Sequence, residues 1–170
     1  MATSKHPGEQ DVSGVPEPGV RRLRRAMAAS PDVVSPQLAR SLQATENVWR
    51  SIAAEFGLLT SGQVAELLGA RPSKRKLAAR RRAAHQIAGV ARRNAVLYPG
   101  FQFDRATGTI FPVMARLIEL ATANGLSEED LLLWICSPTT AFDTEDRPVD
   151  HLAEPDAVLG AAKDQFEVQW

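Results

Sequence analysis

The stretch "LLTSGQVAELLGARPSKRKLAARRRAAHQ" (residues 58–86) joins a short apolar helix to a strongly basic one. Thr60 can cap the first helix, and the side chain of Gln63 at the third helical position can bond back to the backbone of Thr60, which is the capping-box pattern. Gly69 can end that helix in a left-handed conformation. Arg71 precedes a proline and is therefore pushed away from helical geometry. Two short helices separated by such a break predict a helix-turn-helix.

The second helix of this pair is expected to begin after Ser73, which can cap it. At 100° per residue, one side of the helix is apolar and can pack inward; it holds Leu77, Ala84 and Ala88. The opposite side holds Arg75, Ala79, Arg82 and Gln86, and the flanks hold Lys74, Lys76, Arg80 and Arg81. Arginine can bond guanine and glutamine can bond adenine in a DNA major groove, while flanking cations lie beside phosphates. A basic, alanine-rich helix also fits RNA or an acidic protein.

The charges of the chain are divided along its length although their sum is zero. Residues 67–103 hold nine basic residues and no acidic one, whereas residues 104–170 hold four basic and thirteen acidic residues. A solvated helix face usually mixes both signs of charge. The carboxylate-free middle therefore predicts a polyanionic partner.

The chain is expected to have three parts and a mainly α fold with small β-hairpins. Residues 1–35, rich in proline, glycine and basic residues, are expected to be a disordered tail. Residues 36–111 are expected to hold one helix and a winged helix-turn-helix, and residues 112–170 a small helical domain. The first helix has an apolar seam of Leu38, Leu42, Thr45, Trp49, Ile52 and Phe56. That seam fits packing within its own domain and also pairing with a second copy.

The segment "GVARRNAVLYPGFQFD" after the basic helix predicts a β-hairpin that turns at Arg93 and Asn94, because asparagine tolerates positive φ. This hairpin would be a wing that carries Arg92 and Arg93. A second short hairpin is expected to turn at Thr107 and Gly108. Further helices are then expected after Pro112, after Ser127 as the cap with Asp130 answering, and over residues 155–166. The run "LLLWI" (131–135) is apolar on all sides, which predicts burial and leaves it as a second candidate for a dimer interface.

Several classes of protein are disfavoured by the composition. No run of 18 apolar residues occurs, so no membrane span is expected, and the first residues do not resemble a signal peptide. The single cysteine, Cys136, excludes an internal disulfide and is typical of the cytoplasm. The three histidines lie far apart, and none has metal-ligand spacing with that cysteine. We therefore expect no catalytic residue, no metal and no cofactor.

Two regions of the sequence resemble known families. "LLTSGQVAELLG" resembles the first helix of excisionase and MerR-like winged helix-turn-helix domains. "YPGFQFD…GTIFPVM" followed by "LLLWICSPTTAF…DRPVDHLAEPDAVLGAAK" resembles the antitoxin family named for Xre, MbcA and ParS. In that family a Trp-x₃-Pro element, here Trp134 to Pro138, leads to an Arg-Pro-hydrophobic-Asp-x-Leu element, here Arg147 to Leu152.

The resemblance implies an antitoxin that blocks a cognate toxin, in many such systems a RES-domain enzyme that consumes NAD⁺, and that binds its own operator DNA. A homodimer or a toxin–antitoxin hetero-oligomer is the expected assembly. The candidate DNA-binding residues are Ser73, Lys74, Arg75, Lys76, Arg80, Arg81, Arg82, Gln86, Arg92 and Arg93. The candidate toxin-binding residues are Trp134, Pro138, Arg147, Pro148, Asp150 and Leu152, with Phe166 and Trp170 from a tail that can dock into a pocket. The alternative is a free-standing transcription regulator whose C-terminal part dimerises or senses a ligand.

Overall fold

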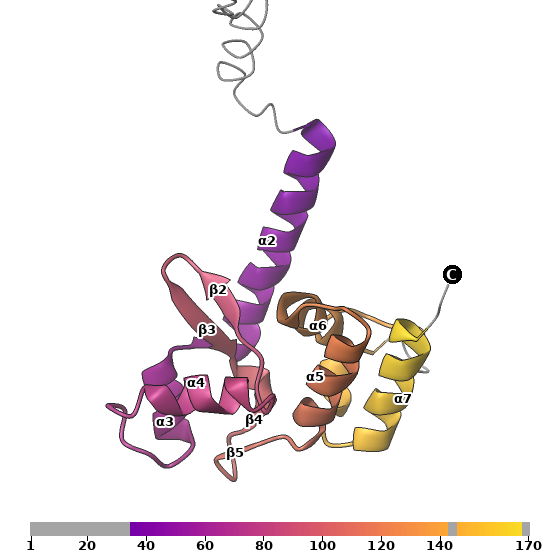
Figure 1. Ribbon diagram of the computed structural model, residues 1–170. Helices are drawn as coiled ribbons and strands as arrows, with labels where there is room; N and C mark the ends of the chain where they lie inside the picture. Colours follow the sequence, from indigo (N-terminus) through magenta and orange to yellow (C-terminus); the bar gives the residue numbers. More distant parts are fainter. Residues whose placement is uncertain (1–34, 143–145, 168–170) are drawn as a thin grey trace, which may run out of the picture. The chain divides into compact units, whose positions relative to one another are not determined.

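The computed structural model describes residues 35–142 and 146–167 (Figure 1). The chain divides into two units, Met1–Ser41 and Leu42–Trp170, and the fold described below is that of the second unit. This part of the chain is mainly helical and carries small antiparallel sheets, as the sequence predicts. The expected tail, residues 1–35, lies outside the described residues except for Ser35.

The first described helix, α2 (Pro36–Phe56), confirms the helix predicted by the apolar seam. The seam is buried only toward its C-terminal end, where Trp49 and Ile52 are 2% and 3% exposed. Leu42, which belongs to the same seam, is 58% exposed. The described part of the protein therefore covers only the C-terminal half of the apolar seam of α2.

Both helices predicted within residues 58–86 are present. The first one begins where it was predicted, and the second one is shorter than predicted. After strand β1 (Leu58–Leu59), helix α3 (Ser61–Leu67) begins at the capping box of Thr60 and Gln63 and is followed by Gly69 at a φ of +76°. Helix α4 spans Lys76–Ala83. Its N-cap is Arg75, which has helical backbone angles and no capping side chain. The expectation that Ser73 caps α4 is therefore wrong, because the chain makes a further turn before the helix begins.

Both predicted hairpins are present. Strands β2 (Val90–Arg92) and β3 (Ala95–Pro99) pair with Arg92 opposite Ala95, so the turn is at Arg93 and Asn94 as predicted. The residue with positive φ is Arg93, at 53°, although asparagine is the one of the two that tolerates it better. Strand β1 joins the other edge of β3 to give a sheet of order β1-β3-β2. The 3₁₀ turn η1 (Gly100–Gln102) leads to β4 (Phe103–Asp104) and β5 (Thr109–Ile110).

The remaining elements are α5 (Val113–Ala123), α6 (Glu128–Ile135), the 3₁₀ helix η2 (Pro148–His151) and α7 (Pro155–Phe166). Helix α6 begins at the predicted capping box of Ser127 and Asp130, and α7 spans the predicted residues. Helix α5 packs against both α6 and α7 (Figure 1). Three residues of the run 131–135, Leu131, Leu132 and Ile135, are fully buried as predicted, whereas Leu133 and Trp134 are half-buried.

The second unit has two apolar cores. The smaller one lies under α3, α4 and the hairpin and consists of Val64, Ala78, Ile87, Tyr98 and Phe103. The larger one combines Trp49 and Ile52 of α2, Val90 of β2 and the buried residues of α5, α6 and α7. Residues from both sides of the predicted domain boundary at 111/112 therefore share one core, and the division of roles at that boundary stays a prediction.

No helix among the described residues is both long and apolar enough to cross a membrane.

Candidate functional site

Most of the predicted cations are exposed on one short segment, the turn before α4 and α4 itself. Residues 71–76 are all exposed, and Ser73 lies among them. The exposed cations of this segment are Arg71, Lys74, Arg75, Lys76, Arg80 and Arg81. No acidic residue lies in the first turn of α4. The segment therefore presents positive charge without a neighbouring carboxylate on the same helix.

The orientation of α4 differs from the predicted one. The residue that faces the small core is Ala78, which is fully buried, whereas the predicted inward residue Ala84 is exposed. Taking 100° per residue from Ala78, the outward face consists of Lys76, Ala79, Arg80 and Ala83, all of which are exposed. The prediction placed Arg82 on the outward face with Arg75, Ala79 and Gln86, whereas Arg82 is only partly exposed. The predicted face followed a helix extended to residue 88, but α4 ends at Ala83.

Helix α4 ends in a tight turn rather than continuing to Gln86. His85 has a φ of 53°, and its amide donates to the carbonyl of Arg82 while the amide of Gln86 donates to that of Arg81. This pair of bonds is the Schellman pattern of a helix end. The Gln86 side chain accepts a 2.7 Å hydrogen bond from Nη1 of Arg81. Gln86 is thus placed beside the helix end and not on the exposed face of α4.

The hairpin arginines point in different ways. Arg93 lies in the turn and is exposed. Arg92 donates from Nη2 to Oε1 of Glu129 at 3.0 Å, and its guanidinium lies 4.7 Å from the centre of the Trp49 ring. The indole Nε1 of Trp49 donates to the same carboxylate oxygen at 2.9 Å. Arg92 is therefore held against the body of the molecule.

Arg82 is paired as well, with the glutamate that precedes Glu129. Its Nε donates to both carboxylate oxygens of Glu128, at 3.0 and 2.8 Å. The backbone amide of Gly89 donates to Oε2 of Glu128 at 2.7 Å. Both partners are partly exposed, with 38% and 31% of their side-chain surface accessible, so such an ion pair contributes only roughly 0–1 kcal/mol to stability. Its main consequence is to fix the direction of Arg82.

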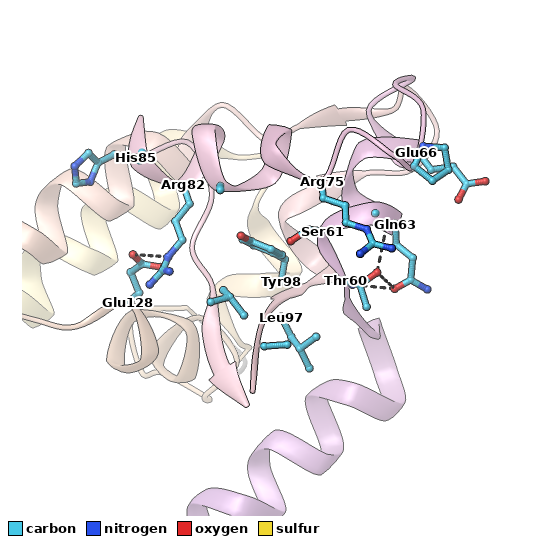
Figure 2. A pocket seen from close by; sticks show the side chains of 16 residues that line it. Thr60, Ser61, Gln63, Glu66, Arg75, Arg82, His85, Leu97, Tyr98 and Glu128 are labelled. Atoms are coloured by element: carbon cyan, nitrogen blue, oxygen red, sulfur yellow. Dashed lines mark hydrogen bonds and ion pairs between the residues drawn. The ribbon is translucent and has the colours of Figure 1, made fainter. Parts of the chain in front are cut away.

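A hollow of about 1000 Å³ lies beside α4. Its walls come from the start of α3, from α4 and from strand β3, and it is lined by Thr60, Gln63, Arg75, Ala79, Arg82 and Tyr98 among others. Figure 2 shows Arg75 and Arg82 on either side of Tyr98, with Glu128 next to Arg82. The two arginines are seven residues apart, so they lie on one face of the helix about 10.5 Å apart along its axis. The hollow is thus flanked by two cations, Arg75 at the N-cap of α4 and Arg82 within it, and is also lined by the carboxylates of Glu66 and Glu128.

Most of the residues predicted to bind a toxin are buried or contact other residues of the protein. Pro148 is buried and Leu152 is 5% exposed, so both belong to the apolar core and present no surface to a partner. Trp134 and Phe166 are half-buried against each other, with ring centres 4.9 Å apart. Pro138 is exposed, and Trp170 lies outside the described residues.

Arg147 and Asp150 form a network with α2. Arg147 donates from Nη1 and Nη2 to the two carboxylate oxygens of Glu55, both at 2.8 Å, and from Nη2 to Oδ1 of Asp150 at 2.9 Å. These hydrogen bonds lower the pKa of the Glu55 and Asp150 carboxyl groups. The same bonds raise the pKa of Arg147. This network ties the turn before η2 to the end of α2.

His151 lies between two carboxylates, and its protonation affects the stability of the folded protein. Its Nδ1 is 3.2 Å from Oε1 of Glu154 and its Nε2 is 3.2 Å from Oδ2 of Asp146, while its ring stacks on Phe142. Only the protonated ring can donate from both nitrogens. The hydrogen bond to Glu154, followed by the weaker effect of Asp146, raises the pKa of His151 above its ordinary value.

A pKa that is raised by folding adds stability below the pKa of the unfolded chain, and this stability is lost as the pH rises through the folded pKa. We therefore expect the melting temperature of the unsubstituted protein to exceed that of His151→Phe by more at about pH 6 than at about pH 8.5, on either side of the ordinary histidine pKa. Thermal melts of both proteins at the two pH values measure this. A difference that does not change with pH would contradict it.

The single cysteine is held in its protonated form, and its surroundings in the described part of the chain offer no metal site. Burial raises the pKa of the Cys136 thiol to about 12, so it is not a thiolate at neutral pH. Among the described residues, no group of three or more His, Cys, Asp or Glu side chains could hold a metal ion.

Three polar residues of this region were missed by the sequence reasoning. Gln102 is fully buried; its Oε1 accepts from the Ala88 amide at 2.7 Å, and its Nε2 donates to the Ala88 carbonyl at 2.9 Å. Glu128 and Glu129 hold Arg82 and Arg92. No local pattern marks these residues, because their partners lie 14 to 46 positions away in the chain.

Comparisons with known proteins bear on the fold alone. The NMR structure of Rv2175c is similar to this chain with a TM-score of 0.56 and 22% identity, over 66% of this chain and 82% of that one. No protein-family model matches the sequence, and no curated protein matches it either.

Proposed function

We propose that this protein binds duplex DNA with a winged helix-turn-helix. In this arrangement α3 is the first helix, α4 is the recognition helix and the β2–β3 hairpin is the wing. The observation that carries the proposal is the exposed group of cations on the turn and on α4, with no acidic residue between positions 67 and 103. The strand order β1-β3-β2 beside the helix pair is compatible with it.

The outward face of α4 suits a DNA groove in size as well as charge. Ala79 and Ala83 are small and exposed, and they alternate with Lys76 and Arg80. Small side chains let the helix backbone approach the bases, while the cations between them reach base edges or phosphates. Arg93 at the hairpin turn is exposed, and in this proposal it contacts the DNA backbone.

The number of phosphate contacts follows from which cations are unpaired with carboxylates. Arg82 and Arg92 are held by Glu128 and Glu129. Seven of the nine basic residues between positions 67 and 103 form no ion pair with a carboxylate among the described residues and are the first candidates for phosphate contacts: Arg71, Lys74, Arg75, Lys76, Arg80, Arg81 and Arg93. Arg82 uses only its Nε for Glu128, so its two Nη groups can add one further contact.

The test is the dependence of DNA affinity on salt. If about six or seven phosphates are contacted, the affinity for duplex DNA should fall on the order of 10³-fold between about 50 and 200 mM salt. Fluorescence anisotropy with a labelled duplex measures it, with structured RNA as the competitor. A flat salt dependence, or RNA that competes better than duplex DNA, would reject the proposal.

We propose further that the C-terminal helices bind a second protein, with the chain acting as the antitoxin of a toxin–antitoxin pair. One support is the resemblance of residues 131–163 to the antitoxin family named for Xre, MbcA and ParS. The other is the partly exposed pair of Trp134 and Phe166, together with Pro138, which is exposed. Its partner would be a cognate toxin, with an NAD⁺-consuming RES-domain enzyme as the first candidate. Co-expression with the adjacent gene should restore growth and yield a complex. If the adjacent gene product is harmless, or is not bound, this role is excluded.

The second candidate is a free-standing DNA-binding regulator, and one observation favours it. The motif that carries the resemblance is accounted for by the fold itself, since Pro148 and Leu152 are core residues and Arg147 is bonded to Glu55 and Asp150. Duplex binding without any effect of the adjacent gene product would support this candidate.

A further inference from the structure

The hollow beside α4 has the features of a phosphodiester site. Arg75 at the N-cap of α4 and Arg82 within α4 line the hollow, and Ala79 lies between them in the chain. The carboxylates of Glu66 and Glu128 also line it, and that of Glu128 is bonded to Arg82. Tyr98 lines the hollow from β3, between the two arginines in Figure 2. The two arginines attract an anionic chain, and the small side chain of Ala79 leaves space for it that a larger side chain would fill.

Glu128 fixes the direction of the Arg82 side chain through the Nε atom alone. Only its Nε donates to Glu128, at 3.0 and 2.8 Å to the two oxygens. Among the described residues, no acceptor is bonded to its Nη1 or Nη2. A guanidinium carries five N–H donors in a planar fork, so the edge formed by the two Nη groups stays available for bidentate binding of a phosphate.

Glu128 is itself fixed from a second direction. The Gly89 amide donates to its Oε2 at 2.7 Å, and the residue belongs to the first turn of α6, which begins at the capping box of Ser127. Its position is therefore set by two elements outside α4. A carboxylate that is held in this way can orient an arginine with little further loss of side-chain entropy on binding.

We propose that the hollow receives a phosphodiester segment of the DNA backbone and that Glu128 is the positioning residue that aims Arg82 at it. The inference rests on the proposed DNA binding. It adds that an acidic residue of the C-terminal part strengthens DNA binding. Simple charge repulsion between a carboxylate and DNA predicts the opposite sign, which makes the inference decidable.

The decisive variant is Glu128→Gln, which removes one negative charge and keeps an oxygen for the Gly89 amide. We expect its affinity for a labelled random-sequence duplex to fall about fivefold to tenfold, the size expected for one arginine contact. The matched control is Glu119→Gln, which removes the same charge from an exposed position of α5. The control should bind equally well or slightly more tightly. Tighter binding by Glu128→Gln would overturn the inference.

A double-mutant cycle shows whether Glu128 acts through Arg82. Arg82→Ala should weaken binding about tenfold. Adding Glu128→Gln to Arg82→Ala should then change nothing further, because the residue that it positions is absent. A purely structural role of Glu128 would give additive losses and a lowered melting temperature instead. Either result would reject the positioning role.

The hollow itself is tested by filling it. Ala79→Leu should weaken duplex binding on the order of tenfold, as expected when a backbone contact is displaced, while Ala123→Leu at an exposed site of α5 serves as the control. If Ala79→Leu does not fold, Ala83→Leu fills the same hollow. Unchanged affinity of the folded variant would place the DNA backbone elsewhere.

Two further outcomes separate this inference from the proposed function. If the unsubstituted chain binds no duplex, both fail. If it binds duplex but Arg82→Ala and Ala79→Leu bind equally well, only the inference fails. A titration with inorganic phosphate at constant ionic strength distinguishes a free-anion site, because saturable binding of phosphate alone would show that the hollow serves a small anion.

Discussion

The double substitution Lys76→Glu and Arg80→Glu is expected to weaken duplex binding on the order of 10³-fold at about 0.1 M salt. Both residues lie on the outward face of α4 and are exposed. The change removes two cations that can release counterions from DNA and puts two repelling carboxylates in their place. Anisotropy titrations with the same labelled duplex measure the loss.

The control for this prediction carries the same change of charge on a different surface. Arg116→Glu and Lys163→Glu change exposed residues of α5 and α7. Charges more than a Debye length from the DNA, about 10 Å at 0.1 M salt, are largely screened. The control should therefore lose far less affinity. Equal losses in the two double variants would mean that net charge, and not the face of α4, controls binding.

Gly100→Ala is expected to lower the free energy of unfolding by roughly 3 kcal/mol or more, at or beyond the upper end of overpacking effects. A Cβ atom at this position would collide with the carbonyl oxygen of Phe56 and approach Nη2 of Arg105. That carbonyl is itself bonded by Arg105 at 2.8 Å, and the Gly100 amide donates to the Gly57 carbonyl at 3.0 Å. The obstacle is backbone that is held on both sides, so it cannot move aside at low cost.

Gly160→Ala is the matched control within α7. In the described part of the chain, no atom beyond the neighbouring residues and the nearby backbone of α7 lies within 4 Å of a Cβ atom built there. Replacing glycine with alanine inside a helix stabilises it by up to about 1 kcal/mol. Urea unfolding of the two variants should therefore give changes of opposite sign. A small effect of Gly100→Ala would show that the contact between η1 and the end of α2 is loose.

Several elements that depend on neighbouring residues were predictable from the sequence, although the Ser73 cap of α4 was not among them. The capping boxes of Thr60 and Ser127 and the turns at Arg93 and Gly108 are present. Each is decided by residues within four positions of one another, so the sequence contains all of the relevant contacts.

The face of α4 was not predictable, because it depends on where the helix ends. The chain leaves helical geometry at Ala84, and His85 takes a left-handed conformation that histidine favours only weakly. Ending the helix there places Ile87 and Ala88 in the apolar cores. Helix periodicity extended to residue 88 therefore assigned Ala84 to the wrong side.

The sequence by itself determined most local elements of this protein, though not the two ends of α4, and the division of its charges along the chain, because these are properties of neighbouring residues. Only the tertiary structure decided which cations stay exposed, since Arg82 and Arg92 meet Glu128 and Glu129 across 46 and 37 positions. It also placed Pro148 and Leu152 in the core. The reason is physical: pairing and burial depend on distance in space, and the packing of α2, α5, α6 and α7 into one apolar core sets those distances.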